Sequence, residues 1–283
     1  MITNNPFAEL SALIPPDIMQ AYVILMVLLV IGGTLLDVIH KKSAKYFFEN
    51  AQKAKKAAKR EVGAGEKIGL AVGTVANEVL TSGEFDNPHR RISHLFTMYG
   101  FIIFAVTTAV LIFSLPAAGS EPSTLVPLLW HLGALMICIG GYWFWFKIRV
   151  DVSAEGHQWY DVSRADLFIV SLLAMATFAL IWSLLQSAGG GVVSSVALFL
   201  FIVAATTLFS TVLWSKFAHM FFKPAAAYQK RITKADGSKE NMPDDYTLTD
   251  PTVQEKFPDI PEYMGKNPPY MGLGIKREAP HHY

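Results

Sequence analysis

Histidines are the residues of this sequence best suited to carry chemistry, and two of the eight have a notable position. Imidazole is both a proton carrier near neutral pH and a common metal ligand. His94 lies at the start of one long apolar stretch and His219 lies near the end of another. Facing imidazoles at one depth in a membrane can ligate a b-type haem, one on each side of the iron. Histidines at helix ends are also often interfacial residues bonded to carbonyls or lipid headgroups, so both interpretations stay open.

The surroundings of the two histidines are compatible with a haem. Ser93 and Ser215 are small neighbours that would leave room for a porphyrin. Three cationic residues stand where haem propionates would emerge: Arg90, Arg91 and Lys216.

His131 is set apart from the other histidines, because it lies at the opposite ends of the apolar stretches. It is a candidate for quinone contact or proton release, since an ionisable group at the border of a membrane span usually has a purpose. A Trp-His pair such as Trp130 and His131 is also common at a membrane interface.

The only cysteine is Cys138, inside an apolar stretch. One cysteine cannot form a disulfide within the chain, a CxxC motif or a cysteine-ligated iron–sulfur cluster. Any iron–sulfur chemistry therefore belongs to a partner.

The elements that must position these residues are membrane-spanning helices. The chain has 283 residues, of which 52% are hydrophobic and only 17% are charged. Its apolar residues form stretches of about 20 residues, the length a helix needs to cross about 30 Å of hydrocarbon. We predict an all-α integral membrane protein, a five-helix transmembrane bundle. The predicted spans are residues 18–39, 94–115, 125–146, 166–186 and 192–220.

The distribution of basic residues predicts the orientation of the bundle. All 24 Lys and Arg residues fall in the segments 40–93 and 147–165 and in the region from residue 214 onward. Because cytoplasmic loops retain Lys and Arg, these segments are predicted to be cytoplasmic. The N-terminus, residues 1–17, and the two turns near residues 116–124 and 187–191 are then periplasmic. The expected location is the inner membrane of a bacterium, with several passes.

The cytoplasmic segment 40–93 is predicted to hold two helices. Residues 41–60 alternate Ala with Lys, which is typical of a helix lying on the anionic inner leaflet or of a solvated basic helix. A second helical period, Ile68, Val72, Val75 and Val79, predicts a helix that packs against the bundle or a partner.

The C-terminal region, residues 224–283, contains eight prolines and no sustained apolar period. Such a segment is expected to be disordered or ordered by wrapping a partner. Its Phe257, Tyr263 and Tyr270 favour a docking tail, because a tail that only dangles has little need for them.

Two stretches carry a family resemblance. The sequence from Asn87 to Phe101 contains Arg-x-x-His and Gly-Phe, and the sequence from Trp214 to Pro224 contains Ser-Lys-Phe-Ala-His. These resemble the second and fifth helices of the cytochrome b subunit of respiratory nitrate reductases. They resemble still more the membrane domain of the quinone-interacting oxidoreductase of sulfate reducers. The resemblance implies a five-helix bundle of the same orientation, with His94 and His219 as axial ligands of the haem iron.

The sequence departs from these families at a second site. Members with two haems carry another histidine pair, and the corresponding positions here are Phe104 and Phe201. The resemblance therefore implies at most one haem, near the cytoplasm. The sulfate-reducer subunit also has a fused iron–sulfur domain that this chain lacks. A cysteine-poor chain with a long cytoplasmic tail is similar to the membrane anchor of adenylylsulfate (APS) reductase from sulfur-oxidising bacteria.

These observations lead to one expected function and two alternatives. The expected function is a membrane anchor and electron-transfer subunit with one haem b, linking a cytoplasmic flavin and iron–sulfur oxidoreductase to membrane quinone. A structural anchor without haem is the first alternative. A small transporter is the second, suggested only by Gly32-Gly33 and Thr107-Thr108 within spans. No feature predicts a nucleic-acid partner.

Overall fold

In the computed structural model of the chain, every regular element of the described part is a helix. The structure describes residues 2–40, 43–83, 85, 87–115, 124–151, 156–238 and 251–256, without the side chains of residues 43–46, 218, 219 and 254. The turn near residues 116–123 and most of the predicted docking tail lie outside this description. Within the tail, residues 251–256 form the short helix α10 (Pro251–Lys256).

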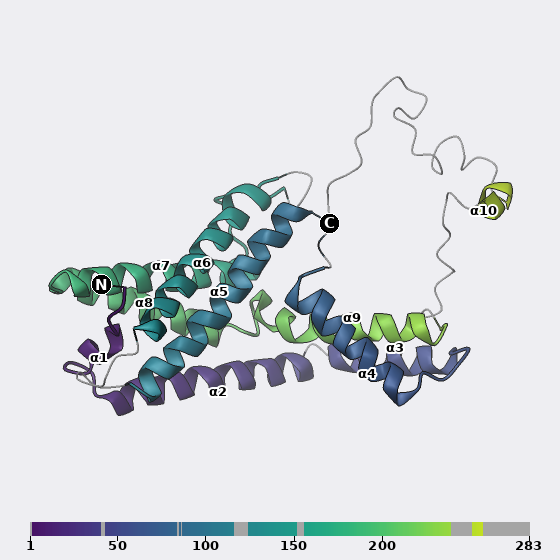
Figure 1. Cartoon of the computed structure of the whole chain (residues 1–283), viewed down its shortest axis with the longest axis horizontal. Coiled ribbons are helices and arrows are strands. Elements are labelled where there is room, and N and C mark those ends of the chain that lie inside the picture. The colour runs from purple at the N-terminus through teal and green to yellow at the C-terminus, as the bar shows by residue number, and fades with distance from the viewer. Residues whose placement is uncertain are drawn as a thin grey trace, which may run out of the picture.

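Five helices are long and apolar enough to cross a membrane, which confirms the predicted number of spans. They run together as the body of the molecule (Figure 1). The second begins six residues before the predicted start, so His94 lies in its second turn. The five are α2 (Pro16–His40), α5 (Pro88–Phe113), α6 (Leu125–Trp143), α7 (Leu167–Ser187) and α8 (Val192–Ser210).

Helices α5 and α6 pack closely because small residues line their contact. A Cβ atom on Gly100 would lie 2.8 Å from the carbonyl oxygen of Gly133, and one on Gly140 would lie 2.6 Å from that of Ser93. The Ser93 hydroxyl donates to the carbonyl of Gly140 (2.8 Å). Close backbone approach through small residues is how helices associate in lipid, where the hydrophobic effect does not drive them together.

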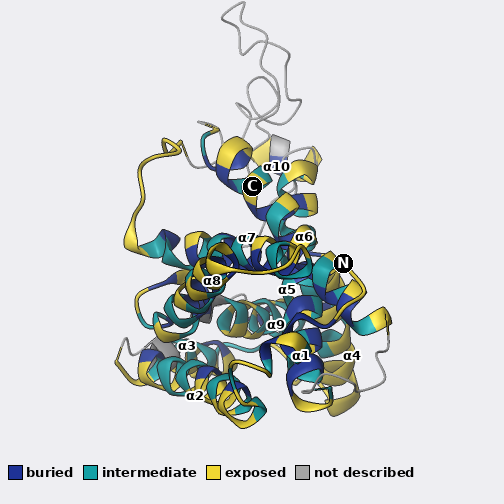
Figure 2. Cartoon of the chain, turned by 90° about the vertical axis from the view of Figure 1, so that its left-hand side faces the viewer, coloured by how far each residue is buried: buried dark blue, intermediate teal, exposed yellow. Residues whose placement is uncertain are grey.

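Helix α2 is the least buried of the five. Its buried residues are only Met19, Met26 and Asp37, and Figure 2 shows exposed residues along its outer face. At one end Gln20 donates to the carbonyl of Ile112 (3.2 Å). At the other end Gly33 lies against Val212, where an added Cβ would come within 2.8 Å. Gly33 thus has a packing role, and the described part of α2 is continuous through this position.

The sequence predicted that the fifth helix ends at residue 220, and this prediction is wrong. The helix ends at Ser210. The backbone N–H groups of Trp214 and Ser215 both bond to the carbonyl of Thr211, which turns the chain. After the turn, Phe217 is buried with its ring 5.5 Å from that of Phe168 on α7. The turn that contains the buried Phe217 separates α8 from the next helix, α9 (His219–Ala235).

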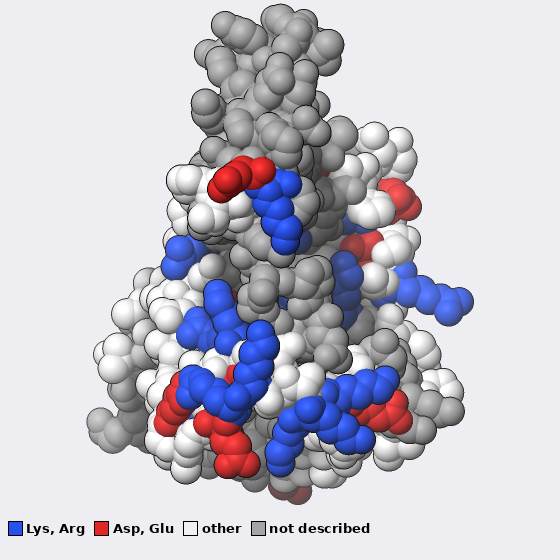
Figure 3. Space-filling view, turned by 90° about the vertical axis from the view of Figure 1, so that its right-hand side faces the viewer, with Lys and Arg blue, Asp and Glu red and all other residues white. Residues whose placement is uncertain are grey.

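Three further helices project from one end of the bundle, which we call the basic end (Figure 1). They are α3 (Ser43–Lys56), α4 (Ala64–Thr74) with its π-helical extension η1 (Val75–Leu80), and α9. Figure 3 shows Lys and Arg side chains gathered on this end, interspersed with Asp and Glu. In Figure 1, α3 continues roughly along the direction of α2.

Helix α9 corrects the prediction that the chain has no stable structure of its own from residue 224 onward. It continues past Pro224 to Ala235 and packs against α3 and α4. Arg231 forms an ion pair with Glu78 (2.9 Å), and the side chain of Arg60 donates to the carbonyl of Ala235 (2.7 Å). The sequence of this segment has no sustained apolar period, and polar contacts such as these hold α9 against its neighbours.

The apolar face of the second cytoplasmic helix was predicted to pack against the bundle or a partner, and packing against a partner stays a prediction. Ile68, Val72 and Val75 are exposed, whereas the helix contacts α9 through its other side. Within the described residues, this face is not packed against the bundle.

Candidate functional site

His94 is held in the second turn of α5 by well-defined local structure. Asn87 caps the helix by accepting from the backbone N–H groups of His89 and Arg90, and Pro88 is its first residue. Both features are typical of a helix start. The Nδ1 atom of His94 lies 2.9 Å from the hydroxyl oxygen of Ser82, which is fully buried. This bond fixes the plane of the imidazole.

The loop that carries Ser82 has an unusual backbone. It follows the π-helical turn η1, and Ser82 has a positive φ of 49°, a conformation that residues other than glycine rarely adopt. Two side chains of α5 tie the loop down: Arg91 donates to the carbonyl of Thr81 (2.7 Å) and Tyr99 donates to that of Leu80 (2.6 Å). π-Helical turns and strained residues are enriched at functional sites. Here they direct a hydroxyl at His94.

Phe85 connects His94 to helix α9. Its ring centroid lies 5.0 Å from that of His94. The guanidinium of Arg90 lies 5.6 Å from the centroid of the same ring, and the ammonium of Lys223, on α9, lies 5.2 Å from it. Cations over an aromatic face are attracted by its quadrupole. The start of α9 is therefore near the imidazole of His94.

His219 is the first residue of α9, and its side chain lies outside the described part of the structure. It stands four residues before Lys223, whose ammonium reaches the ring that packs on His94. The structure thus brings the backbone of His219 to the same end of the bundle as His94.

The three cations predicted to meet haem propionates lie at this end but have different surroundings. Arg90 packs on Phe85, and Arg91 holds the loop through the carbonyl of Thr81. Lys216 is an exposed residue in the short turn before α9. Arg90 lies 5.6 Å from the centroid of the ring that packs on His94.

The positions of the missing second histidine pair face each other. The ring centroids of Phe104 on α5 and Phe201 on α8 are 6.5 Å apart. Trp130 lies 5.1 Å from Phe104, and Trp182 stacks on Phe201 at 5.9 Å. Phe7 of the short helix α1 (Pro6–Leu10) packs on both tryptophans. Aromatic side chains therefore occupy both positions at which the two-haem families carry the second histidine pair.

His131 lies on α6, far along the bundle from His94, and both of its ring nitrogens are engaged. Nδ1 lies 2.7 Å from the carbonyl oxygen of Pro127, and Nε2 lies 2.8 Å from the hydroxyl oxygen of Ser183 on α7. To contact a quinone through Nε2, His131 would have to release Ser183. The observed bonds instead join α6 to α7.

A separate polar cluster stabilises the loop between α6 and α7. Arg149 is buried, stacks on Trp145 at 4.3 Å, and forms an ion pair with Asp166 (2.7 Å). It also donates to the carbonyls of Gln158 (2.7 Å) and Asp161. With all these bonds made within the loop, the cluster has a structural role.

The residues missed by sequence reasoning are Ser82, Phe85 and Lys223. Each contacts His94 or the ring that covers it. Hydropathy and helical periodicity carry no signal for them, because Ser82 and Phe85 lie in an irregular loop. The only local sign is the Ser82-Gly83 pair, which is typical of a tight turn.

The described residues fit one half of a haem site. A ligating histidine usually has its second nitrogen held by a hydrogen-bonding partner. Since Ser82 engages Nδ1 of His94, an iron would be ligated by Nε2. No group of three or more His, Cys, Asp or Glu residues is arranged as a metal site in the described part of the chain. A bis-imidazole haem needs only two ligands, so the second half depends on His219.

The five apolar helices indicate a multi-pass membrane protein by their length and composition. Comparison of the chain with protein-family models, with curated proteins and with solved structures found no match. The arrangement around His94 is what supports a more specific function.

Proposed function

We propose that this chain anchors a cytoplasmic oxidoreductase to the inner membrane of a bacterium and passes electrons between that enzyme and membrane quinone. The bundle would lie with its N-terminus outside and its basic end in the cytoplasm. One haem b would be held by His94 and His219 at the basic end. The observation that supports this proposal best is the contact series from His94 through Phe85 to Lys223, because it joins the two helices that carry the proposed ligands.

The chain's own residues have defined tasks in this proposal. The hydroxyl oxygen of Ser82 would accept a hydrogen bond from Nδ1–H of His94 and so keep Nε2 directed at the iron. Phe85 would shield the imidazole from water. Arg90, with Arg91 and Lys216 nearby, would compensate the negative charge of the propionates. The haem, when bound, supplies one-electron transfer.

The soluble partner would hold the flavin and iron–sulfur centres, since the only cysteine is Cys138. An adenylylsulfate reductase is the proposed partner, by the resemblance of the two histidine-bearing stretches and the layout of the chain. The docking surface would consist of the basic end and the tail, residues 224–283. Quinone contact at His131 is the proposed outer-side role of that residue, and it requires the Ser183 bond to open.

The haem is tested by the absorption spectrum of the purified, dithionite-reduced protein. A b-type band that is lost in both His94→Ala and His219→Ala supports the proposal. His157→Ala is the matched control, because this histidine also lies at the basic end but is half exposed, with its imidazole 3.4 Å from the carboxylate of Asp161. Retention of the band in either ligand variant would refute the assignment.

The partner is tested by co-sedimentation of the soluble enzyme with membranes. Removal of residues 239–283 leaves α9 and its contacts with α3 and α4 intact. If the tail is the docking element, the enzyme is released from membranes that contain the shortened chain. Unchanged co-sedimentation would assign docking to the helices of the basic end alone.

A structural anchor without haem is the second candidate. This candidate is favoured by two contacts that His94 makes without a metal: Ser82 bonds to its Nδ1, and the ring of Phe85 packs on its imidazole. The same spectrum separates the two candidates, because this anchor shows no band. The transporter alternative has less support: Thr107 and Thr108 bond to carbonyls of their own helix, and the described part of α5 is continuous there.

A further inference from the structure

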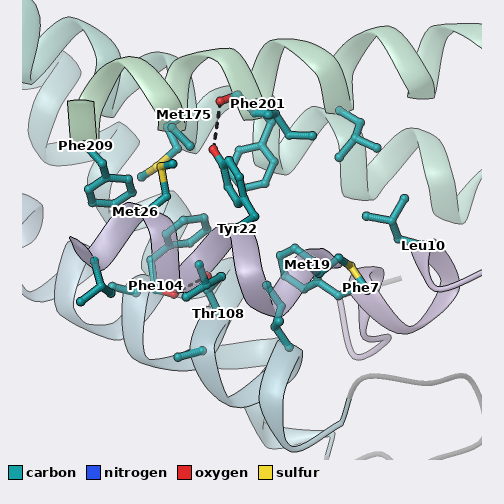
Figure 4. A pocket seen from close by; sticks show the side chains of 18 of the residues that line it. Phe7, Leu10, Met19, Tyr22, Met26, Phe104, Thr108, Met175, Phe201 and Phe209 are labelled. Carbon is teal, nitrogen blue, oxygen red and sulfur yellow. Dashed lines mark hydrogen bonds between the residues drawn. The ribbon is translucent and has the colours of Figure 1, made fainter. Parts of the chain in front are cut away.

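A cavity of about 320 Å³ lies between α2 and the rest of the bundle, distant from His94 (Figure 4). It extends along α5 from Phe101 to Ile112, about 17 Å at 1.5 Å per residue. Across from α5 it is bounded by α2 from Ile18 to Val27 and by residues of α8. Ligand-binding cavities typically start at about 300 Å³, so this one can hold part of a small molecule.

The wall of the cavity is almost entirely apolar, and its few hydroxyl groups are already engaged. Tyr22 bridges from α2 to α8, where its hydroxyl lies 2.9 Å from that of Thr206 and 3.2 Å from the carbonyl oxygen of Ile202. Thr108 accepts from the indole N–H of Trp130 (2.9 Å) and donates to the carbonyl of Phe104 (2.7 Å). A charged or strongly polar headgroup would find no partner inside and would be costly to bury.

The cavity is accessible from the side of the bundle that faces lipid. Ile18 and Val27 line it, yet both have more than half of their surface exposed. Helix α2 is attached to the bundle near Gln20, Tyr22 and Gly33, and all of its residues that line the cavity lie between Ile18 and Val27. Walls without partner atoms lose dispersion contacts, so an apolar guest that fills the space is favoured.

We propose that this cavity binds one hydrocarbon chain of a molecule dissolved in the bilayer, with its headgroup left at the membrane surface. The chain is either the acyl chain of a phospholipid or the tail of an isoprenoid quinone, which share this chemistry. The site depends on neither the haem nor a soluble partner.

Photolabelling of the purified protein in detergent, with each probe added to it, tests this site. Two probes are compared: a phosphatidylcholine with a diazirine in its acyl chain, and a ubiquinone analogue with a diazirine in its isoprenoid tail. We expect saturable labelling of cavity residues on α2 and α5 by at least one probe, suppressed by an excess of the same molecule without diazirine. The probe that labels identifies the source of the chain.

Variants that fill the cavity provide the second measurement. Ala105→Phe and Ala109→Phe place a ring in the space, and both are expected to lose saturable labelling. Val106→Phe adds a ring to the same helix on its exposed face, outside the lining, and is expected to label as wild type. The inference is overturned if neither probe labels the wild-type cavity saturably, or if labelling persists in folded Ala105→Phe and Ala109→Phe proteins.

Discussion

The Ser82 hydroxyl oxygen lies 2.9 Å from Nδ1 of His94 and joins the strained loop after η1 to the second turn of α5. A buried serine with positive φ is costly unless its position is required. The bond orients the imidazole whether or not a metal is bound. Replacement of Ser82 therefore tests whether His94 is a haem ligand or a structural residue, because only a ligand would lose haem affinity.

Ser82→Ala is expected to weaken haem binding without removing its ligand. Loss of the hydrogen-bonding partner of a ligating histidine typically lowers metal affinity by about 10-fold to 100-fold. Titration of haem into the apoprotein measures this change. Ser195→Ala, an exposed serine on α8, is the control and should bind haem as wild type. Equal affinity in Ser82→Ala would show that Ser82 does not support a ligand.

Gly140→Ala is expected to destabilise the bundle, because the new Cβ would lie 2.6 Å from the carbonyl oxygen of Ser93. Overpacking of this kind costs about 1–3 kcal/mol. Gly32→Ala is the matched control, since a Cβ there has no atom within 4 Å. Thermal unfolding in detergent compares the two. Equal stability of both variants would contradict the close approach of α5 and α6.

Arg149→Ala is expected to lower the unfolding free energy by about 3–5 kcal/mol, because it leaves the carboxylate of Asp166 without its partner in a buried pair. Denaturant unfolding followed by tryptophan fluorescence measures the loss. Arg164→Ala removes a nearby exposed cation and should have little effect. A small effect of Arg149→Ala would mean that the loop is held by other contacts.

The number and position of the spanning helices could be predicted from the sequence, because apolar length is a direct physical requirement of the bilayer. The end of the fifth helix could not. Residues 211–220 remain fairly apolar, and after the turn Phe217 packs on Phe168 of α7 and Phe209 of α8, contacts that the sequence does not reveal. The helical course of α9 past Pro224 depends likewise on ion pairs such as Arg231 to Glu78.

The candidate site was predictable only in part. His94 and His219 could be chosen by their place at helix ends, but the partner Ser82 could not, since its contact depends on one positive φ. The stripe Ile68, Val72 and Val75 predicted a face packed against the bundle or a partner, and this face is exposed in the described structure. Periodicity identifies an apolar face but does not indicate what covers it.

The orientation of the bundle is a prediction of the charge distribution, and reporter fusions test it. Alkaline phosphatase fused after residue 115 or 188 is expected to be active, because both positions follow helices that run away from the basic end. Green fluorescent protein fused after residue 151 or 283 is expected to fluoresce. The reverse pattern would place the basic end outside and remove the cytoplasmic partner.

The amount of haem per chain tests the central claim most directly. A pyridine haemochrome assay on the purified wild-type protein is predicted to give one haem b per chain. This value follows from two histidines at the basic end and from aromatic rings that occupy the second position at Phe104 and Phe201. A value of zero would leave only a membrane anchor, and a value of two would contradict a second position occupied by Phe104 and Phe201 in place of histidines.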